Sequence, residues 1–321
     1  MITHPTSNRF VLQSSRLTVA VESYGSWVSE VLEANGNNLL ALRTWDTPIP
    51  TYEGGVYGSS SDKFHADYMG GWHTLFPNTG EQSHFSGVDL PFHGEAASKN
   101  WDITSHSNSK LELETDCSLS MSVCRTITLV ESKLRIEDEI SNRSPNMSSF
   151  LFGHHPVFPL SNDLILDLPA YDLETISISG FESNSLFGRE LKSTHIDFGN
   201  LNLERPLKGL FNLANLEQGW FGLGHKNSEA GIIFCWDTQT MPNFWIWIEN
   251  MSPEFPWFGR SHFLGLEPQT APNPYGLAHS VKFSDDKRLG ANESIKTWVE
   301  LNYTTDYRSA IQVLIKESSE R

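Results

Sequence analysis

Hydrophobic positions alternate with polar ones over most of this chain, which is typical of β-strands with one buried face. Leu17, Val19 and Val21 share one face of an expected strand, and the apolar runs that follow flank Asn35–Gly36, a pair that favours a β-hairpin turn. Residues 101–151 contain short runs with the same alternation, separated by Ser, Asn and Asp. The pattern predicts an all-β chain, organised as a large antiparallel sandwich or barrel.

The remaining segments are assigned by the same criteria. Residues 229–249 are expected to form a strand pair with a turn at 238–243, and the segments HSVKFS and SIKTWVELNY to form closing strands. Residues 44–70 and 70–82 are expected to be loops, the second because Pro77 disfavours a central strand. Only the last segment, DYRSAIQVLIKESSER, has helical spacing of apolar residues.

No internal repeat and no shift in composition divides the chain. We therefore expect one domain over residues 1–321, with a β core over about 16–303 and a helical tail over 304–321.

Charge and cysteine content narrow the class of protein. A formal net charge of −16 disfavours binding to nucleic acid and to an anionic membrane surface. Three cysteines without CxxC spacing predict neither a disulfide framework nor a zinc site. No leader-like segment opens the chain, and no apolar run is long enough to span a bilayer. We expect a cytoplasmic protein, monomeric or homodimeric.

Three separate stretches carry candidate acid/base chemistry. His154 and His155 lie in FLFGHHPVFP, His93 in LPFHGEAASKNW, and Glu267 in FLGLEPQTAPNP. Each histidine, taken alone, also fits a structural role. Glu267 is harder to explain structurally, because a carboxylate at the end of an apolar strand is costly unless it is paired or used. Burial would also raise its pKa toward the range of a general base.

Together, and in this order, the three stretches resemble the aldose 1-epimerase (galactose mutarotase-like) superfamily. His93-Gly94 followed by Trp101, the run Gly153-His154-His155-Pro156-Val157-Phe158, and Glu267-Pro268-Gln269-Thr270 match motifs of that family. The resemblance covers most of the chain, and its combination of motifs is far more specific than any one of them.

The resemblance implies a large β-sandwich with a sugar cleft, and an acid/base mechanism. The residue matching Glu267 would be the general base on the anomeric hydroxyl, and the residue matching His155 the general acid on the ring oxygen. His93 would hydrogen-bond the sugar near that oxygen. The substrate would be a small sugar, and neither a metal nor an organic cofactor would be needed.

One position departs from the family pattern. Many members carry Arg four residues after the first motif histidine, whereas this chain has Ala97, with Lys99 nearby. The departure leaves the sugar open and argues against a sugar phosphate, in line with the acidic composition.

Further candidates for sugar contacts are chosen by position. Trp72, His73 and Asn78 lie in a glycine-flanked segment before His93. Trp247 shares a strand face with Trp245, and we expect one of this pair to belong to the core. The remaining candidates are Asp237, at a strand end, and His154, which could instead pack structurally. The histidines at 65, 73, 84 and 106 lack metal-ligand spacing.

Two other functions remain open at this level. A carbohydrate-binding or sensing protein could keep the fold and cleft without turnover, since fold does not fix function. A glycan hydrolase or lyase would need a second carboxylate facing Glu267, for which Glu95 and Asp237 are the first candidates.

Overall fold

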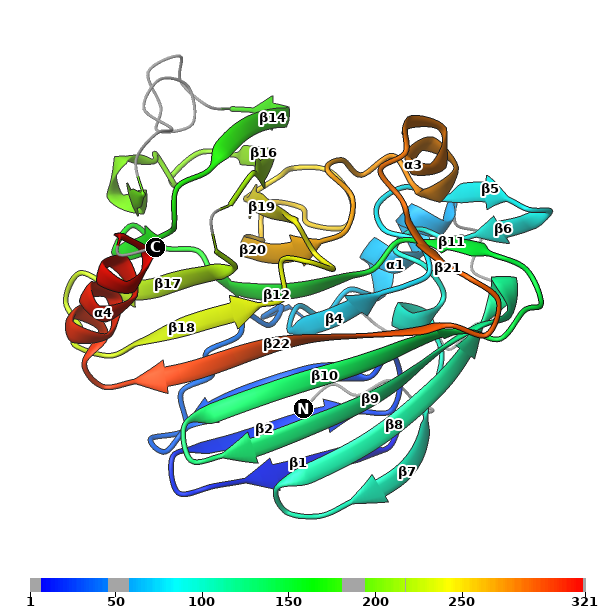
Figure 1. The fold of residues 1–321 in the computed structure, drawn as a ribbon. Helices are drawn as coiled ribbons and strands as arrows, with labels where there is room; N and C mark the ends of the chain where they lie inside the picture. Colours follow the sequence, from blue (N-terminus) through cyan, green and yellow to red (C-terminus); the bar gives the residue numbers. More distant parts are fainter. Residues whose placement is uncertain (1–6, 46–57, 181–193, 217, 320–321) are drawn as a thin grey trace.

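The computed structural model describes residues 7–45, 58–180, 194–216 and 218–319. Its strands form two nine-stranded sheets, with antiparallel pairing throughout the named strand pairs (Figure 1). This architecture confirms the predicted all-β antiparallel sandwich.

The first sheet carries the candidate site. In spatial order its strands are β1 (Arg9–Gln13), β2 (Leu17–Glu22), β3 (Trp27–Glu33), β4 (Trp72–Leu75), β12 (Gly153–Pro159), β20 (His262–Gln269), β19 (Asn243–Asn250), β16 (Leu207–Ala214) and β14 (Asp172–Ser179).

The second sheet covers one face of the first. Its strands, again in spatial order, are β15 (His195–Asp197), β13 (Leu164–Asp167), β17 (Trp220–His225), β18 (Gly231–Trp236), β22 (Ser294–Thr304), β10 (Lys133–Asn142), β9 (Met121–Val130), β8 (Lys110–Cys117) and β7 (Asp102–His106). Two small sheets pair β5 (Ser83–Phe85) with β6 (Val88–Leu90), and β11 (Ser148–Phe150) with β21 (Lys287–Leu289).

Within the described residues, helices are few and peripheral. They are α1 (Ser60–Asp67), α3 (Leu277–Phe283) and α4 (Tyr307–Ser319), with short 3₁₀ turns η1 (Ala96–Ser98), η2 (Ser118–Ser120) and η3 (Phe198–Asn200). The terminal helix α4, predicted from its spacing, packs beside β17 and β18 (Figure 1). Its Tyr307 ring lies against Gly222, Gly224 and Gly231, where a β-carbon would clash with the ring. No helix in the described ranges is both long and apolar enough to cross a membrane.

The core between the sheets follows from the alternation seen in the sequence. On β10, Leu134, Ile136 and Ile140 are fully buried on the same face as Asp138, while Arg135, Glu137 and Glu139 face outward. Burying such an aliphatic side chain contributes roughly 1.5–3 kcal/mol to the free energy of folding, so the two sheets pack with their apolar faces together.

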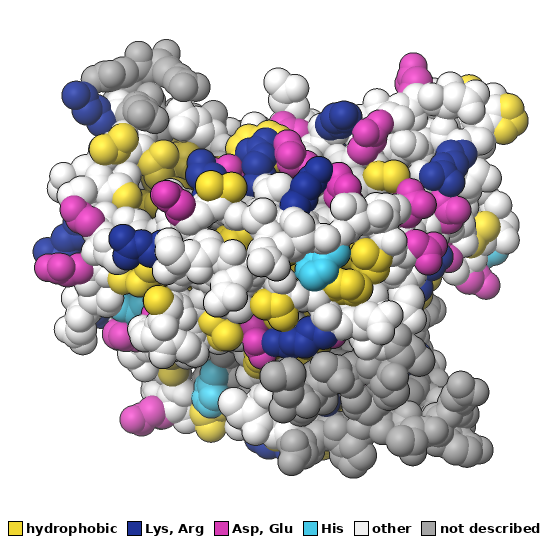
Figure 2. All heavy atoms as spheres, turned by 90° about the horizontal axis from the view of Figure 1, so that it is seen from below, with side chains coloured by type: hydrophobic (Ala, Val, Ile, Leu, Met, Phe, Trp, Pro, Cys, Tyr) yellow, Lys and Arg dark blue, Asp and Glu magenta, His cyan; other side chains and the backbone are white. Residues whose placement is uncertain are grey.

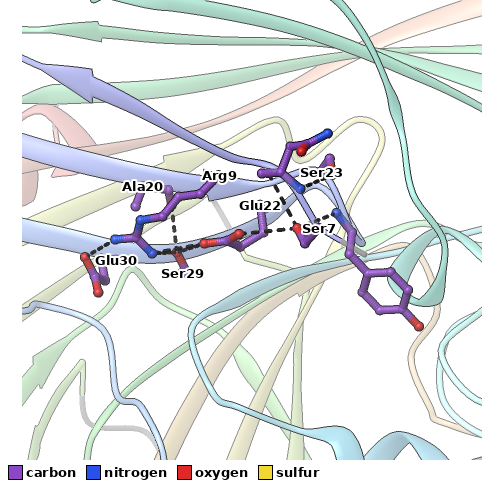
Figure 3. A network of polar contacts seen from close by, with 9 residues as sticks. Ser7, Arg9, Ala20, Glu22, Ser23, Ser29 and Glu30 are labelled. Atoms are coloured by element: carbon purple, nitrogen blue, oxygen red, sulfur yellow. Dashed lines mark hydrogen bonds and ion pairs between the residues drawn. The ribbon is translucent and has the colours of Figure 1, made fainter. Parts of the chain in front are cut away.

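A polar network ties the N-terminal edge of the first sheet together (Figure 3). Arg9 Nη1 donates to Glu22 Oε1 at 3.0 Å, and Arg9 Nη2 donates to Glu30 Oε2 at 2.5 Å. Because Arg9, Glu22 and Glu30 lie on β1, β2 and β3, the pairs join the three strands at this end of the first sheet. On the face seen in Figure 2, acidic and basic side chains are interspersed, with no broad patch of one sign.

Several local predictions were wrong. The expected loop over 44–70 contains α1, which Ser59 caps by accepting the N–H of Asp62, while residues 46–57 lie outside the described ranges. The segment HSVKFS belongs to helix α3, since its helical turn buries Leu277 and Ser280.

Three further predictions need correction in the sheets. The expected loop over 70–82 includes strand β4, which pairs with β12, and Pro77 falls after the strand ends. The strands of 229–249 exist, but β18 and β19 belong to different sheets and do not pair. After the turn at Asn35–Gly36 the chain makes only an isolated bridge, Leu32 to Asn38, instead of a full hairpin strand.

Candidate active site

A cleft of about 460 Å³ lies on the outer face of the first sheet, away from the core between the sheets. Its floor is built by strand alternation: His155 from β12, Glu267 from β20, Trp247 from β19 and Lys208 from β16 all line it. His93, from the loop after β6, lines the same cleft. The three sequence stretches with acid/base candidates therefore meet in one place.

His155 and Glu267 are directly opposed on neighbouring antiparallel strands. The register pairs Gly153 with Gln269 and Val157 with Gly265, which sets His155 across from Glu267 between these pairs. Their side chains meet, with His155 Nε2 at 3.4 Å from Glu267 Oε1. Strand pairing thus brings together residues that are far apart in sequence.

The carboxyl group of Glu267 is almost completely removed from water, with 2% of the residue exposed. Burial raises its pKa well above the usual value, and a hydrogen bond from Gln269 opposes this rise. That bond runs from Gln269 Nε2 to Glu267 Oε2 at 3.1 Å. A glycine at 153 leaves room for the amide, since a β-carbon there would lie 2.0 Å from Gln269 Oε1.

The imidazole of His155 is also buried, and burial lowers its pKa to about 3. Burial therefore disfavours the charged form of both groups and favours an uncharged pair, a carboxylic acid beside a neutral imidazole. One proton can pass between these two groups across the 3.4 Å separation. A pair with this property is suited to moving protons on a bound, uncharged ligand.

His93 is held in an unusual backbone conformation, with φ of 62°. Its Nδ1 accepts the backbone N–H of Gly80 at 3.1 Å. Burial lowers its pKa well below the usual value, so the ring is neutral and carries its proton on Nε2. The ring stands edge-to-face with His155, 5.5 Å between centroids. His93 thus supplies the cleft with a neutral N–H donor of fixed tautomer.

Aromatic side chains that the sequence argument missed form the walls. Phe64 and Tyr68 come from α1 and its C-cap, Phe92 precedes His93, and Trp257 comes from the loop before β20. Tyr68 and Trp257 belong to a buried cluster on this outer face with Val157 and Phe263. In the sequence, the only signal for these wall residues is that their segments are rich in aromatic residues. Their contacts with the cleft depend on tertiary packing, which local sequence does not reveal.

Two predicted sugar contacts, His154 and Trp72, belong instead to the core. His154 is fully buried, accepts the Trp72 indole N–H at its Nδ1, and places Nε2 at 3.3 Å from Asp138 Oδ2. Asp138 in turn accepts two hydrogen bonds from Arg125. Consecutive strand residues point to opposite faces, so His154 and Trp72 face inward where His155 and His73 face outward.

His73 and Asn78 support the site without lining the main cleft. His73 stacks on Trp27 and lines a smaller adjoining cavity of about 170 Å³. Asn78 donates to the carbonyls of Glu81 and Pro91 and accepts the N–H of Leu277. These hydrogen bonds satisfy the side-chain amide of Asn78, so this residue stabilises the loops around His93.

Asp237 and Glu95 are also engaged elsewhere. Asp237 Oδ1 accepts the Gln239 N–H in a turn, and Glu95 accepts the N–H and hydroxyl of Ser118. Neither lines the cleft, so neither supplies the second carboxylate that a hydrolase would need. Both tryptophans of the pair line the cleft, Trp247 beside His155. Trp245 is 2% exposed, and its indole N–H donates to Ala271 O.

The far end of the cleft carries a charged pair that the sequence argument also missed. Lys208 and Glu249 are cross-strand neighbours, with Nζ and Oε2 3.9 Å apart. Ala97, at the position of the family arginine, lines the smaller cavity. Lys99 donates to the carbonyl of Asp116, so it does not replace that arginine in the cleft.

No protein-family model matches this sequence, and no curated protein matches it. Solved structures do share its fold. A galactose mutarotase-like protein from Lactobacillus casei is 17% identical over 92% of this chain and 100% of its own, with a TM-score of 0.64. A galactose mutarotase related enzyme from Lactobacillus acidophilus is 13% identical, covering 93% and 98%, with a TM-score of 0.65. An aldose epimerase homologue from C. elegans is 13% identical, covering 94% and 100%, with a TM-score of 0.63. The chain therefore has the galactose mutarotase-like fold.

Proposed function

We propose that this chain, on its galactose mutarotase-like fold, is an aldose 1-epimerase-like isomerase that interconverts the α and β anomers of a hexose or a modified hexose. The observation that carries the proposal is the contact between His155 Nε2 and Glu267 Oε1, 3.4 Å apart in a cleft that His93 also lines. The substrate is a small sugar.

The proposed reaction is a proton cycle. When a sugar binds, hydrogen bonds from its hydroxyls favour the ionised carboxylate of Glu267, and His155 holds the proton. Glu267 then removes the proton of the anomeric hydroxyl while the bond between C1 and the ring oxygen breaks. His155 gives its proton to the ring oxygen, leaving an open-chain aldehyde.

The open-chain state matches the resting protonation of the pair. Glu267 is again a carboxylic acid and His155 a neutral imidazole, the forms that burial favours for both groups. Rotation about C1–C2 followed by the reverse proton transfers closes the ring with the other anomer. His93 Nε2–H holds a sugar oxygen in place, and no charge accumulates on the enzyme over a turnover.

Anomer exchange measured by NMR saturation transfer across a panel of aldohexoses tests this function. With Glu267→Gln, a shape-matched replacement, exchange should fall by about 10²–10⁴-fold, the usual contribution of a general base. Retained folding of the variant, checked by circular dichroism, excludes a trivial loss. Near-normal exchange in the variant would refute the assignment.

The alternative is a carbohydrate-binding or sensing protein, which Ala97 in place of the family arginine favours. It predicts chemical-shift changes on sugar addition without faster anomer exchange. We further propose a cytoplasmic protein; the free state of Cys117, Cys124 and Cys235 fits a reducing compartment.

A further inference from the structure

Tyr68 occupies a fixed position at the wall of the cleft. It is the C-cap of α1, and its carbonyl and that of Ala66 both accept from Arg43 Nη1, at 3.5 and 3.2 Å. Its ring packs among His73, Trp257 and Phe263, and 3% of the residue is exposed. The side chain therefore has little freedom to turn away from the cleft.

The hydroxyl of Tyr68 is buried and makes no hydrogen bond to the described part of the protein. A buried hydroxyl without a partner is costly, and native proteins satisfy nearly all such groups. Tyr307 shows how this chain treats a comparable case, since its hydroxyl donates to Asp167 Oδ2 at 2.6 Å. The unsatisfied hydroxyl of Tyr68 thus points to a ligand as its missing partner.

The neighbours of Tyr68 indicate that this partner would lie in the cleft. Its ring is 5.8 Å from the ring of His155 and 6.0 Å from that of Trp247, both of which line the cleft. Burial, together with the charge of Glu267, raises its pKa well above the usual value. The phenol therefore keeps its proton and remains a neutral hydrogen-bond donor.

We propose that Tyr68 is a substrate-binding residue whose hydroxyl donates a hydrogen bond to a sugar oxygen held beside Glu267 and His155. This inference rests on the proposed function of the cleft and adds a donor that none of the matched motifs contains. With His93 Nε2–H, it gives the site two neutral donors. A donor to the oxygen that Glu267 deprotonates stabilises the charge that develops there.

The test removes one oxygen atom from each of two tyrosines. Tyr68→Phe should lower kcat/KM for anomer exchange by about tenfold to a hundredfold, the range for a hydrogen bond to a developing charge. Its Tm should stay the same or rise, because no protein contact is lost. Tyr307→Phe, which is remote from the cleft, should lower Tm and keep the wild-type exchange rate.

The outcomes separate this inference from the function on which it rests. Wild-type kcat/KM in Tyr68→Phe would overturn the inference, as would a fall in Tm matching that of Tyr307→Phe, which would show a structural role. If the wild-type protein accelerates exchange of no sugar, the proposed function fails. Tyr68 is then tested by sugar affinity in NMR titrations: a tenfold weaker Kd in the variant supports the contact, and an equal Kd overturns it.

Discussion

His155 and Glu267 face each other across the β12–β20 ladder, and their side-chain atoms Nε2 and Oε1 lie 3.4 Å apart. When ionised, Glu267 carries a negative charge and His155 a positive charge, but burial disfavours the charged form of each group. The pair therefore shares one proton, which lies on Glu267 in an uncharged pair or on His155 in an ion pair. This relationship, more than either residue alone, makes the cleft a candidate proton-transfer site.

The pH dependence of anomer exchange should report Glu267. Its pKa is raised well above 4.5, and the proton that it holds in the free protein is the one that His155 must give to the ring oxygen. Loss of this proton at high pH leaves His155 with none to give, so kcat/KM should fall as pH rises through the elevated pKa of Glu267. His155, with a pKa of about 3, does not titrate in that range in the free protein. Polarimetry over a pH series gives the profile, and a rate that rises with pH through this range instead of falling would contradict the assignment.

Gln269 should tune the pKa of Glu267. Its amide donates to Glu267 Oε2 and favours the ionised carboxylate, so Gln269→Leu should raise the pKa of Glu267 further and move the alkaline limb of kcat/KM to higher pH. The loss of one charge-assisted hydrogen bond predicts about a tenfold lower rate near neutral pH.

Gly153→Ala is an independent way to test Gln269, because the new β-carbon would displace its amide. We expect the same upward shift of the alkaline limb in this variant. An unshifted limb in both variants, with normal folding, would show that Gln269 does not act on Glu267.

Acid should destabilise the fold through His73. Its folded-state pKa is lowered by burial to about 4, below the value of 6.5 in the unfolded chain. Between these values only the unfolded chain binds the proton, so the free energy of unfolding falls as pH drops, by up to about 1.4 kcal/mol per pH unit. In His73→Gln, urea denaturation should show a slope against pH smaller by one proton. Equal slopes in the two proteins would count against this assignment.

Asp138 should be essential for stability. It pairs with Arg125 in the core at 2.7 Å, and both side chains are at most 1% exposed. Asp138→Ala leaves a buried guanidinium without its counter-charge and should cost about 3–5 kcal/mol of unfolding free energy, measured by urea denaturation.

Glu137→Ala is the matched control on the neighbouring position of β10. Glu137 pairs with Arg135 at 3.3 Å, with a side chain 54% exposed, and such surface pairs contribute about 0–1 kcal/mol. Similar losses in the two variants would contradict a special role for the buried pair.

The local alternation of apolar and polar residues was enough to predict many of the strands. Strands β8 to β10 lie where the alternation of the sequence predicts them, because one face of each is more deeply buried than the other. Helices α1 and α3 escaped the same reasoning. They are short, and their conformation depends on the capping of α1 by Ser59 and on the burial of Leu277 rather than on a long apolar stripe.

By itself, the sequence determined the β class and the motif residues His93, His155 and Glu267, whose chemistry depends on residue type and immediate neighbours. Only the tertiary structure decided that these residues meet, since strand register joins β12 to β20 across more than a hundred residues of chain. It also decided that His155 faces the cleft while His154 faces the core. A strand exposes alternate residues to opposite sides, and which side becomes the cleft depends on what packs against the sheet.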